Sequence, residues 1–162
     1  MDWPALRLSL QLAAATALLL LPLGIVIARA LAWRRFAGRR WVEAVLALPL
    51  VLPPTVLGFY LLVTFGAQSP LGRAFESLTG STLAFSFAGL LLASLIVNLP
   101  FAIQPMQRAF ESIPADVRAA AACCGMSPWR IFARIELPLA WPGVLSAMVL
   151  TFAHTLGEFG VV

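Results

Sequence analysis

Long uncharged stretches alternate with short charged ones along this chain, and the long ones predict membrane-spanning helices. The first, Leu8 to Ala28, contains 21 residues and measures roughly 31 Å as a helix at about 1.5 Å per residue, which matches the ~30 Å hydrocarbon core of a bilayer. Three later uncharged stretches are at least as long. We expect spans over residues 8–29, 44–65, 83–104 and 138–158.

A cleaved signal peptide is the alternative interpretation of the first stretch, because Ala28, Ala30 and Ala32 are small. The apolar run is longer than that of an ordinary signal peptide, and a cluster of arginines follows it. These two features favour a retained span.

The composition agrees with a membrane protein rather than with a soluble domain. Of the 162 residues, 61% are hydrophobic and 11% are charged, and the mean hydropathy is +0.94. A soluble core of this size could not bury so much apolar surface. The sequence therefore predicts an all-α integral membrane protein with a single domain over residues 1–162.

The cationic residues narrow the possible functions, because all eleven are arginine. A nucleotide-binding P-loop needs lysine, so the chain is not its own ATPase of that type. The arginines lie beside the apolar stretches and form no stripe with aromatic residues, so membrane lipid rather than nucleic acid is the expected partner. Cys123 and Cys124 cannot hold a metal ion alone. We expect no catalytic, cofactor or metal site.

The distribution of arginines also predicts the orientation in the membrane, since cationic flanks stay on the cytoplasmic side. Nine arginines flank the first and third connections, whereas only Arg7 and Arg73 lie on the other side. We therefore expect the N-terminus outside the cell and the third connection, residues 114–137, in the cytoplasm.

This third connection is predicted to contain two short helices separated by a turn. Pro114 suits a first helical position, and Gly125 suits the residue just beyond a helix end. Ser127 and Pro128 then supply an N-cap and a first-turn proline for a second helix that ends near Glu136.

The spacing within the connection resembles the cytoplasmic loop of binding-protein-dependent ABC importer permeases. Two alanines, three residues, a glycine, nine residues and an Ile-x-Leu-Pro motif match at Ala120-Ala121, Gly125 and Ile135 to Pro138. The resemblance implies a type I importer bundle in which this coupling helix docks on a separate ABC ATPase subunit, so that the chain itself is not an enzyme. The residues that it implicates in ATPase coupling are Asp116, Arg118, Ala119, Ala120, Ala121, Gly125, Ser127, Leu137 and Pro138.

The chain departs from the family pattern at Ala119, where the family usually has a glutamate directly before the two alanines. Asp116 lies three residues earlier, on a neighbouring part of the helix surface. We hypothesise that Asp116 supplies the missing carboxylate.

Four further stretches, at residues 48–62, 83–89, 98–114 and 153–162, resemble the sulfate and molybdate branch of this family. Phe159 favours molybdate, because sulfate permeases typically have tyrosine there. The resemblance implies a homodimeric molybdate importer of the bacterial inner membrane, working with an ATPase and with a periplasmic or lipid-anchored molybdate-binding protein. The alternatives are import of tungstate, sulfate or thiosulfate, and a membrane scaffold or channel. Because family members continue with a further helix, we expect the domain to be incomplete at its C-terminus.

Polar side chains are sparse within the expected spans, and an ionisable or amide group there is a candidate for the transport path or its gate. The candidates are Thr55, Asn98, His154 and Glu158. His154 and Glu158 are four residues apart and share a helical face; ordinary packing and an interfacial position are the alternative. Asn98 lies beside Pro100 and has a structural alternative, which is bonding to a carbonyl that the proline leaves free.

Overall fold

The computed structural model describes the backbone of residues 3–159, and the side chains in that range except those of Pro54, Glu158 and Phe159. The regular structure of this range is helical throughout, which confirms the all-α prediction. In chain order the helices are α1 Trp3–Trp33, α2 Arg39–Val51, α3 Pro54–Phe65, α4 Pro70–Thr79, α5 Phe87–Glu111, α6 Ala115–Cys123, α7 Pro128–Ile131, the π-helical segment η1 Phe132–Glu136, and α8 Leu137–Phe159.

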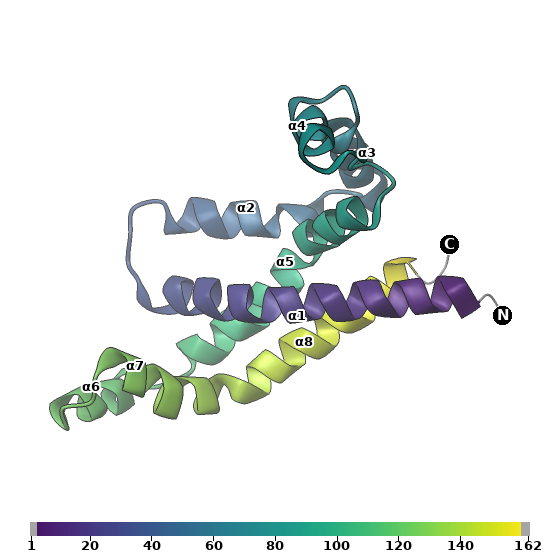
Figure 1. The fold of residues 1–162 in the computed structure, drawn as a ribbon. Coiled ribbons are helices and arrows are strands. Elements are labelled where there is room, and N and C mark those ends of the chain that lie inside the picture. The colour runs from purple at the N-terminus through teal and green to yellow at the C-terminus, as the bar shows by residue number, and fades with distance from the viewer. Residues whose placement is uncertain (1–2, 160–162) are drawn as a thin grey trace.

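Three long helices, α1, α5 and α8, cross one another and form the core of the bundle (Figure 1). Each is long and apolar enough to cross a membrane. The residues buried where they meet are Ala28, Leu31, Ile103, Met106, Phe110, Ile113, Ala140, Val144 and Ala147. Many leucines, valines and tryptophans elsewhere on the helices are exposed, as expected of surfaces that face lipid.

Residues 44–65, expected as one span, belong to two helices that are bent by 109° relative to each other. Pro53 and Pro54 have no backbone N–H to donate, and a proline also disfavours helical geometry in the residue before it. Leu52 and Pro53 accordingly have extended ψ angles of 135° and 138°. The prolines therefore divide this stretch into a broken span or a re-entrant hairpin.

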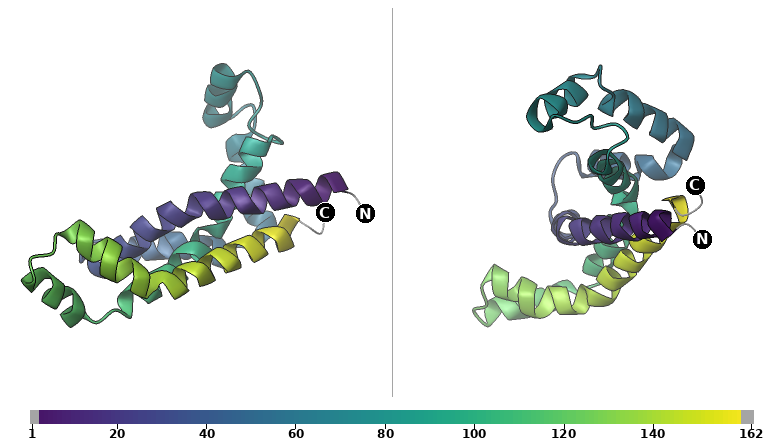
Figure 2. Two further views of the ribbon diagram at one scale, coloured as in Figure 1. Left: turned by 60° about the horizontal axis from the view of Figure 1, so that its bottom comes forward. Right: turned by 45° about the vertical axis from the view of Figure 1, so that its right-hand side comes forward.

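The bundle has two distinguishable ends (Figures 1 and 2). α6 and α7 lie at the end where α1 finishes and α2 begins. The α3–α4 hairpin projects away from that end. The short helices expected in the third connection are therefore close to the arginine-rich connection between α1 and α2.

Gly143 lets α8 approach α5 closely. A Cβ atom added at this position would lie 2.3 Å from the Cβ of Ala109 and 3.2 Å from the carbonyl oxygen of Pro105. Both atoms belong to the rigid part of a neighbouring helix and cannot rotate away. The absence of a side chain at Gly143 is therefore a condition for this helix crossing.

Substituting Gly143→Ala is expected to lower the free energy of unfolding by about 1–3 kcal/mol, because an overpacked core must shift its helices. Thermal unfolding in detergent measures the effect. Gly157→Ala, on the same helix, is the matched control, since an added Cβ there meets no atom within 4 Å. Equal melting temperatures for the two variants would contradict the close crossing.

Candidate coupling segment and polar path

Residues 114–137, here termed the elbow, connect α5 to α8. The chain turns sharply at Gly125, whose φ of +76° is a conformation that glycine adopts without steric cost. The Gly125 N–H donates to the Ala122 carbonyl at 2.9 Å, and the Met126 N–H donates to the Ala121 carbonyl at 3.2 Å. This pair of bonds is a Schellman ending, which satisfies the last carbonyls of α6. The turn therefore fixes α6 relative to α7.

The second half of the elbow begins at Ser127 and Pro128, which stand at the N-cap and the first position of α7. The Ser127 hydroxyl makes no capping hydrogen bond, so Pro128 supplies the local preference for helix. Pro114 instead stands at the N-cap of α6 with an extended ψ of 136°, so it lies one residue before the first helical position that the sequence predicts for it. α6 begins at Ala115 and α7 at Pro128.

The elbow does not end in a break before the last span. α7 continues through the π-helical segment η1 into α8. Pro128–Gly157 is therefore a single helical segment, long and apolar enough to cross a membrane. The Leu137 N–H donates to the Phe132 carbonyl, five residues back, so one extra residue is accommodated without interrupting the helix. Leu137 is half-buried and Pro138 is exposed. The second short helix and the fourth expected span are therefore parts of a single bent rod.

α6 presents one face to the bundle and another outward. Ala121 is buried and Arg118 is half-buried, so these two face the bundle. The other candidates on this helix, Asp116, Ala119 and Ala120, are exposed. The outward face consequently combines small side chains with one carboxylate, and another protein surface can approach its backbone closely.

The side chain of Glu136 is fully buried and joins the elbow to α1. Its Oε2 accepts from Arg29 Nε at 2.5 Å, and its Oε1 accepts from Arg118 Nε at 2.6 Å. The Arg118 guanidinium lies 4.0 Å from the centroid of the Trp33 ring, and that of Arg29 lies 5.1 Å from the centroid of the Phe132 ring. These five residues are here termed the Glu136 joint.

Neither Glu136 nor Arg29 stands out in the sequence as a site residue. The available signal is that Glu136 is an acidic residue next to the last uncharged stretch, in a segment that also carries three arginines. A charge at the edge of a membrane span needs a partner. Which arginine serves as that partner depends on how α1 and α6 are placed, and spacing alone does not give this placement.

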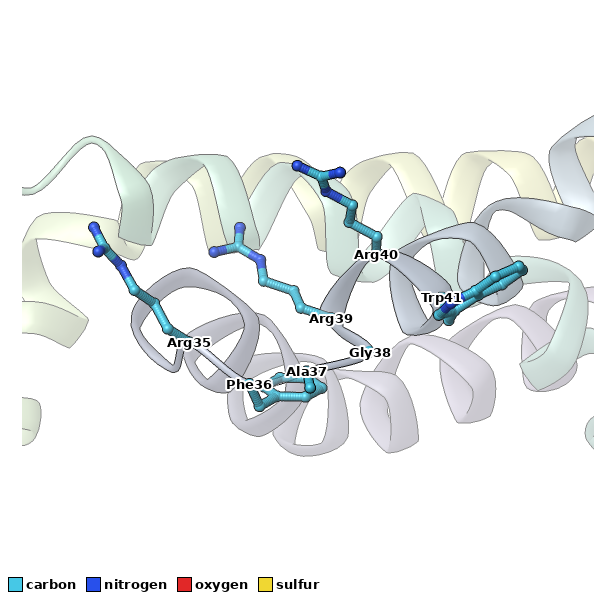
Figure 3. Close-up of a pocket in the computed structure, with 7 residues that line it drawn as sticks. All are labelled: Arg35, Phe36, Ala37, Gly38, Arg39, Arg40 and Trp41. Carbon is cyan, nitrogen blue, oxygen red and sulfur yellow. The ribbon is translucent and has the colours of Figure 1, made fainter.

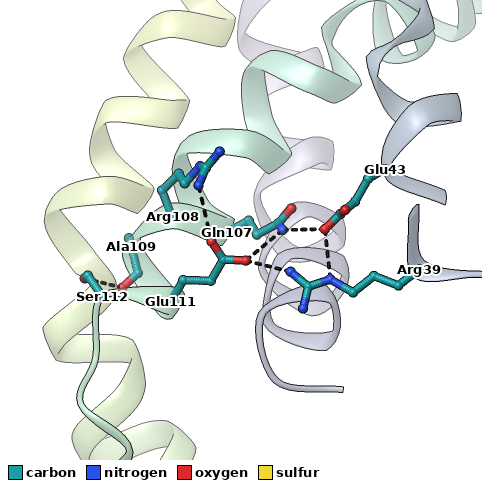
Figure 4. Close-up of polar contacts among 7 residues, drawn as sticks. All are labelled: Arg39, Glu43, Gln107, Arg108, Ala109, Glu111 and Ser112. Carbon is teal, nitrogen blue, oxygen red and sulfur yellow. Dashed lines mark hydrogen bonds and ion pairs between the residues drawn. The ribbon is translucent and has the colours of Figure 1, made fainter. Parts of the chain in front are cut away.

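A second charged cluster fastens α2 to α5 at the same end of the bundle (Figure 4). Arg39 Nε donates to Glu43 at 2.9 Å, and Arg39 Nη2 donates to Glu111 at 2.8 Å. Gln107 Nε2 donates to both carboxylates, at 2.9 and 3.0 Å. Arg108 Nη1 lies 3.7 Å from the second oxygen of Glu111. These side chains are partly exposed, so each pair contributes little stability alone, but together they set the position of α2 along α5.

The connection between α1 and α2 forms an open basic depression of about 540 Å³ (Figure 3). Arg35 and Arg40 project from it, and Trp41 at its rim is 77% exposed. Arginine and tryptophan together suit the headgroup layer of a bilayer.

A line of polar side chains, three buried and one half-buried, crosses the bundle and links α1, α5 and α8. Thr16 Oγ1 donates to Ser94 Oγ at 2.9 Å, and Asn98 Nδ2 donates to the Ser94 carbonyl at 2.9 Å. His154 Nδ1 lies 3.2 Å from Asn98 Oδ1. An amide oxygen only accepts, so the hydrogen of this bond sits on Nδ1.

Two of the four path candidates, Asn98 and His154, are thus brought together. Thr55 is exposed on α3, and the side chain of Glu158 lies outside the described residues. The Asn98 amide bonds to the Ser94 carbonyl rather than to the Ile96 carbonyl, which is the one that Pro100 leaves without its helical donor.

His154 also borders a cavity of about 740 Å³ lined mainly by residues of α2, α3 and α5. Of the described side chains that line it, His154 is the one polar member. Its ring stacks on Phe101, with 3.9 Å between the ring centroids. An apolar cavity with a single polar group does not resemble a high-affinity site for a dianion, which needs several convergent donors.

Comparison with known proteins agrees with this architecture. Residues 20–162 match the family described as binding-protein-dependent transport system inner membrane component. The chain is 50% identical over 161 residues to the molybdenum transport system permease protein of Azotobacter vinelandii, covering 99% of this chain and 71% of that protein. It is 39% identical over 159 residues to the same-named protein of Escherichia coli K12, covering 98% and 69%.

A more distant relative comes from the sulfate branch. A probable sulfate transport system permease protein of Chlorella vulgaris is 34% identical over 156 residues, which cover 96% of this chain and 58% of that protein. The family match extends over most of the chain, and the helices are those of a multi-pass membrane protein. The chain therefore belongs to the family of binding-protein-dependent transport system inner membrane components.

Proposed function

We propose that this chain is the permease subunit of an ATP-driven importer and forms the path for molybdate across the bacterial inner membrane. The observation that carries the proposal is the 50% identity, over 99% of the chain, to a molybdenum transport system permease. The identity to the sulfate permease is lower, at 34%. Tungstate, sulfate and thiosulfate are the alternative cargoes.

The partner that supplies energy in this proposal is an ABC ATPase subunit, docked on the outward face of α6. The small exposed side chains of Ala119 and Ala120 support this docking site, because they let another backbone come close. In the proposed orientation the elbow is cytoplasmic and the N-terminus is outside, since nine of the eleven arginines flank the connections at the elbow end.

The proposed path runs beside Asn98 and His154, with Thr55 and Glu158 as further path or gate residues. Because the described cavity offers His154 as its one polar group, selectivity is assigned to a periplasmic or lipid-anchored binding protein that delivers the oxyanion. A second copy of the chain is proposed to complete the path as a homodimer.

Transport by reconstituted vesicles tests the proposal. Vesicles that contain the permease, its ATPase and its binding protein should accumulate radioactive molybdate only when ATP is supplied. A chain that does not co-purify with an ATPase would contradict the importer assignment. Uptake of sulfate that molybdate does not inhibit would instead reassign the cargo.

The Asp116→Asn variant tests the hypothesis that this carboxylate replaces the one missing at Ala119. Asp116 is exposed, and exposed ion pairs contribute about 0.2–1 kcal/mol. We therefore expect the Kd for the ATPase to rise by a factor of about 1.4 to 5, measured by titration of the two purified subunits. Glu76→Gln, at an exposed carboxylate on α4, is the matched control. An unchanged Kd would remove Asp116 from the contact.

A further inference from the structure

Three structural elements meet at the carboxylate of Glu136. Its side chain has no exposed surface, and each of its oxygens accepts one N–H, from Arg29 at 2.5 Å and from Arg118 at 2.6 Å. Arg29 belongs to α1 and Arg118 to α6, while Glu136 itself is the last residue of η1, directly before α8. One buried group therefore bonds the proposed docking helix to two of the long membrane helices.

Aromatic rings restrict how the two arginines can move. The Arg118 guanidinium lies over the Trp33 ring, and the Arg29 guanidinium lies over the Phe132 ring. A planar guanidinium held against a ring has few orientations that still point an N–H at the carboxylate. The rings therefore fix the orientation of each guanidinium relative to the Glu136 carboxylate, in addition to the length of each hydrogen bond.

The π-helical segment brings Glu136 onto the buried face of the rod. Ile131 and Glu136, both buried, are five residues apart, which is the repeat of a π turn. From Glu136 onward the buried positions Ala140 and Val144 follow at the α-helical spacing of four. Because of the extra residue, Glu136 lies on the same side of the helix as the buried core residues of α8.

Stability alone does not account for a buried ion triad. Replacing such a group by apolar residues of similar volume is often neutral or stabilising, whereas a bonded triad has one preferred geometry. The property that distinguishes the Glu136 joint from apolar packing is therefore the relative orientation that it imposes on α1, α6 and α8.

We propose that Glu136 is a positioning residue for energy coupling: it holds α6 in a fixed orientation to α1 and α8, so that a displacement of α6 by the ATPase moves both membrane helices together. The inference rests on the proposed function, because it takes α6 as the docking site of an ATPase.

The test compares three variants within the assembled transporter in vesicles. Glu136→Gln removes the charge with little change in volume. Arg118→Gln detaches α6 while leaving the bond between Glu136 and Arg29. Arg134→Gln is the matched control, since Arg134 lies in the same π-helical segment and is exposed. The quantity measured is molybdate imported per ATP hydrolysed, normalised to permease–ATPase complexes recovered.

We expect Glu136→Gln and Arg118→Gln to lower the transport ratio about tenfold, which lies within the usual range of coupling between sites, while ATP hydrolysis persists. The control should keep the ratio of the unchanged protein. Spin labels attached to Cys123 of α6 and at Ala37→Cys, in the connection between α1 and α2, measure the distance between these two parts of the protein. Cys124→Ser removes the other exposed thiol, so that each label has one site. Their distance distribution should broaden in Glu136→Gln.

An unchanged transport ratio in both variants overturns the inference, and so does a distance distribution that stays narrow. If neither variant assembles with the ATPase, Glu136 has only a structural role, and the inference fails as well. These results differ from a failure of the proposed function, in which the unchanged protein itself would neither bind an ATPase nor import molybdate.

Discussion

An Ala120→Trp variant is expected to bind the ATPase at least roughly 30-fold more weakly, and to lose ATP-driven uptake in proportion. Ala120 is exposed on the outward face of α6, where only small side chains permit close approach. Disrupting the centre of a protein interface costs about 2 kcal/mol or more, which corresponds to that factor in Kd. Binding of the two purified subunits and uptake by vesicles measure the effect.

The fold itself should tolerate this substitution, because an exposed alanine leaves room for a larger side chain. Ala74→Trp, at an exposed position of α4 on the hairpin away from the elbow, is the matched control. Both variants should unfold at the temperature of the unchanged protein. Full ATPase binding by Ala120→Trp would show that the docking face lies elsewhere.

The double variant Arg29→Met/Arg118→Met is expected to lower the free energy of unfolding by about 3–5 kcal/mol, because it leaves a fully buried carboxylate without its charged donors. Among the described side chains, these two arginines are the hydrogen-bond donors to the Glu136 carboxylate. Thermal unfolding in detergent measures the loss. A melting temperature equal to that of the unchanged protein would contradict the burial of Glu136.

Adding Glu136→Leu to this double variant should restore most of the lost stability, since the uncompensated charge is then gone. The triple variant separates stability from positioning: we expect it to be folded but poorly coupled. A triple variant that transports normally would show that apolar packing suffices at this place.

The sequence alone predicts the features of the fold that depend on neighbouring residues in the chain. Three of the four uncharged stretches of membrane length coincide with long helices, because a bilayer tolerates few charges, whereas residues 44–65 are divided between α2 and α3. Gly125 marks the turn of the elbow, because a positive φ favours glycine. The match to the permease family confirms the resemblance that the spacing around Ala120 and Gly125 indicates.

Other features depend on packing and could not be predicted from local spacing. The contact of His154 with Asn98, 56 residues away, cannot be read from local spacing, while the shared helical face of His154 and Glu158 stays a prediction because the Glu158 side chain lies outside the described residues. Arg29 and Glu136 are separated by 107 residues. The continuity of α7 with α8 arises from a π-helical turn, whereas the second short helix is expected from the sequence to end near Glu136.

The crossing at Gly143 gives α8 the geometry of a lever. Glu136 lies seven residues before this contact, or about 10 Å along the helix, and His154 lies eleven residues after it, or about 16 Å, at 1.5 Å per residue. If α8 tilts as a rigid body with Gly143 as its fulcrum, His154 travels roughly one and a half times as far as Glu136, in the opposite direction. A small push at the elbow would therefore be amplified at His154, near the opposite end of α8.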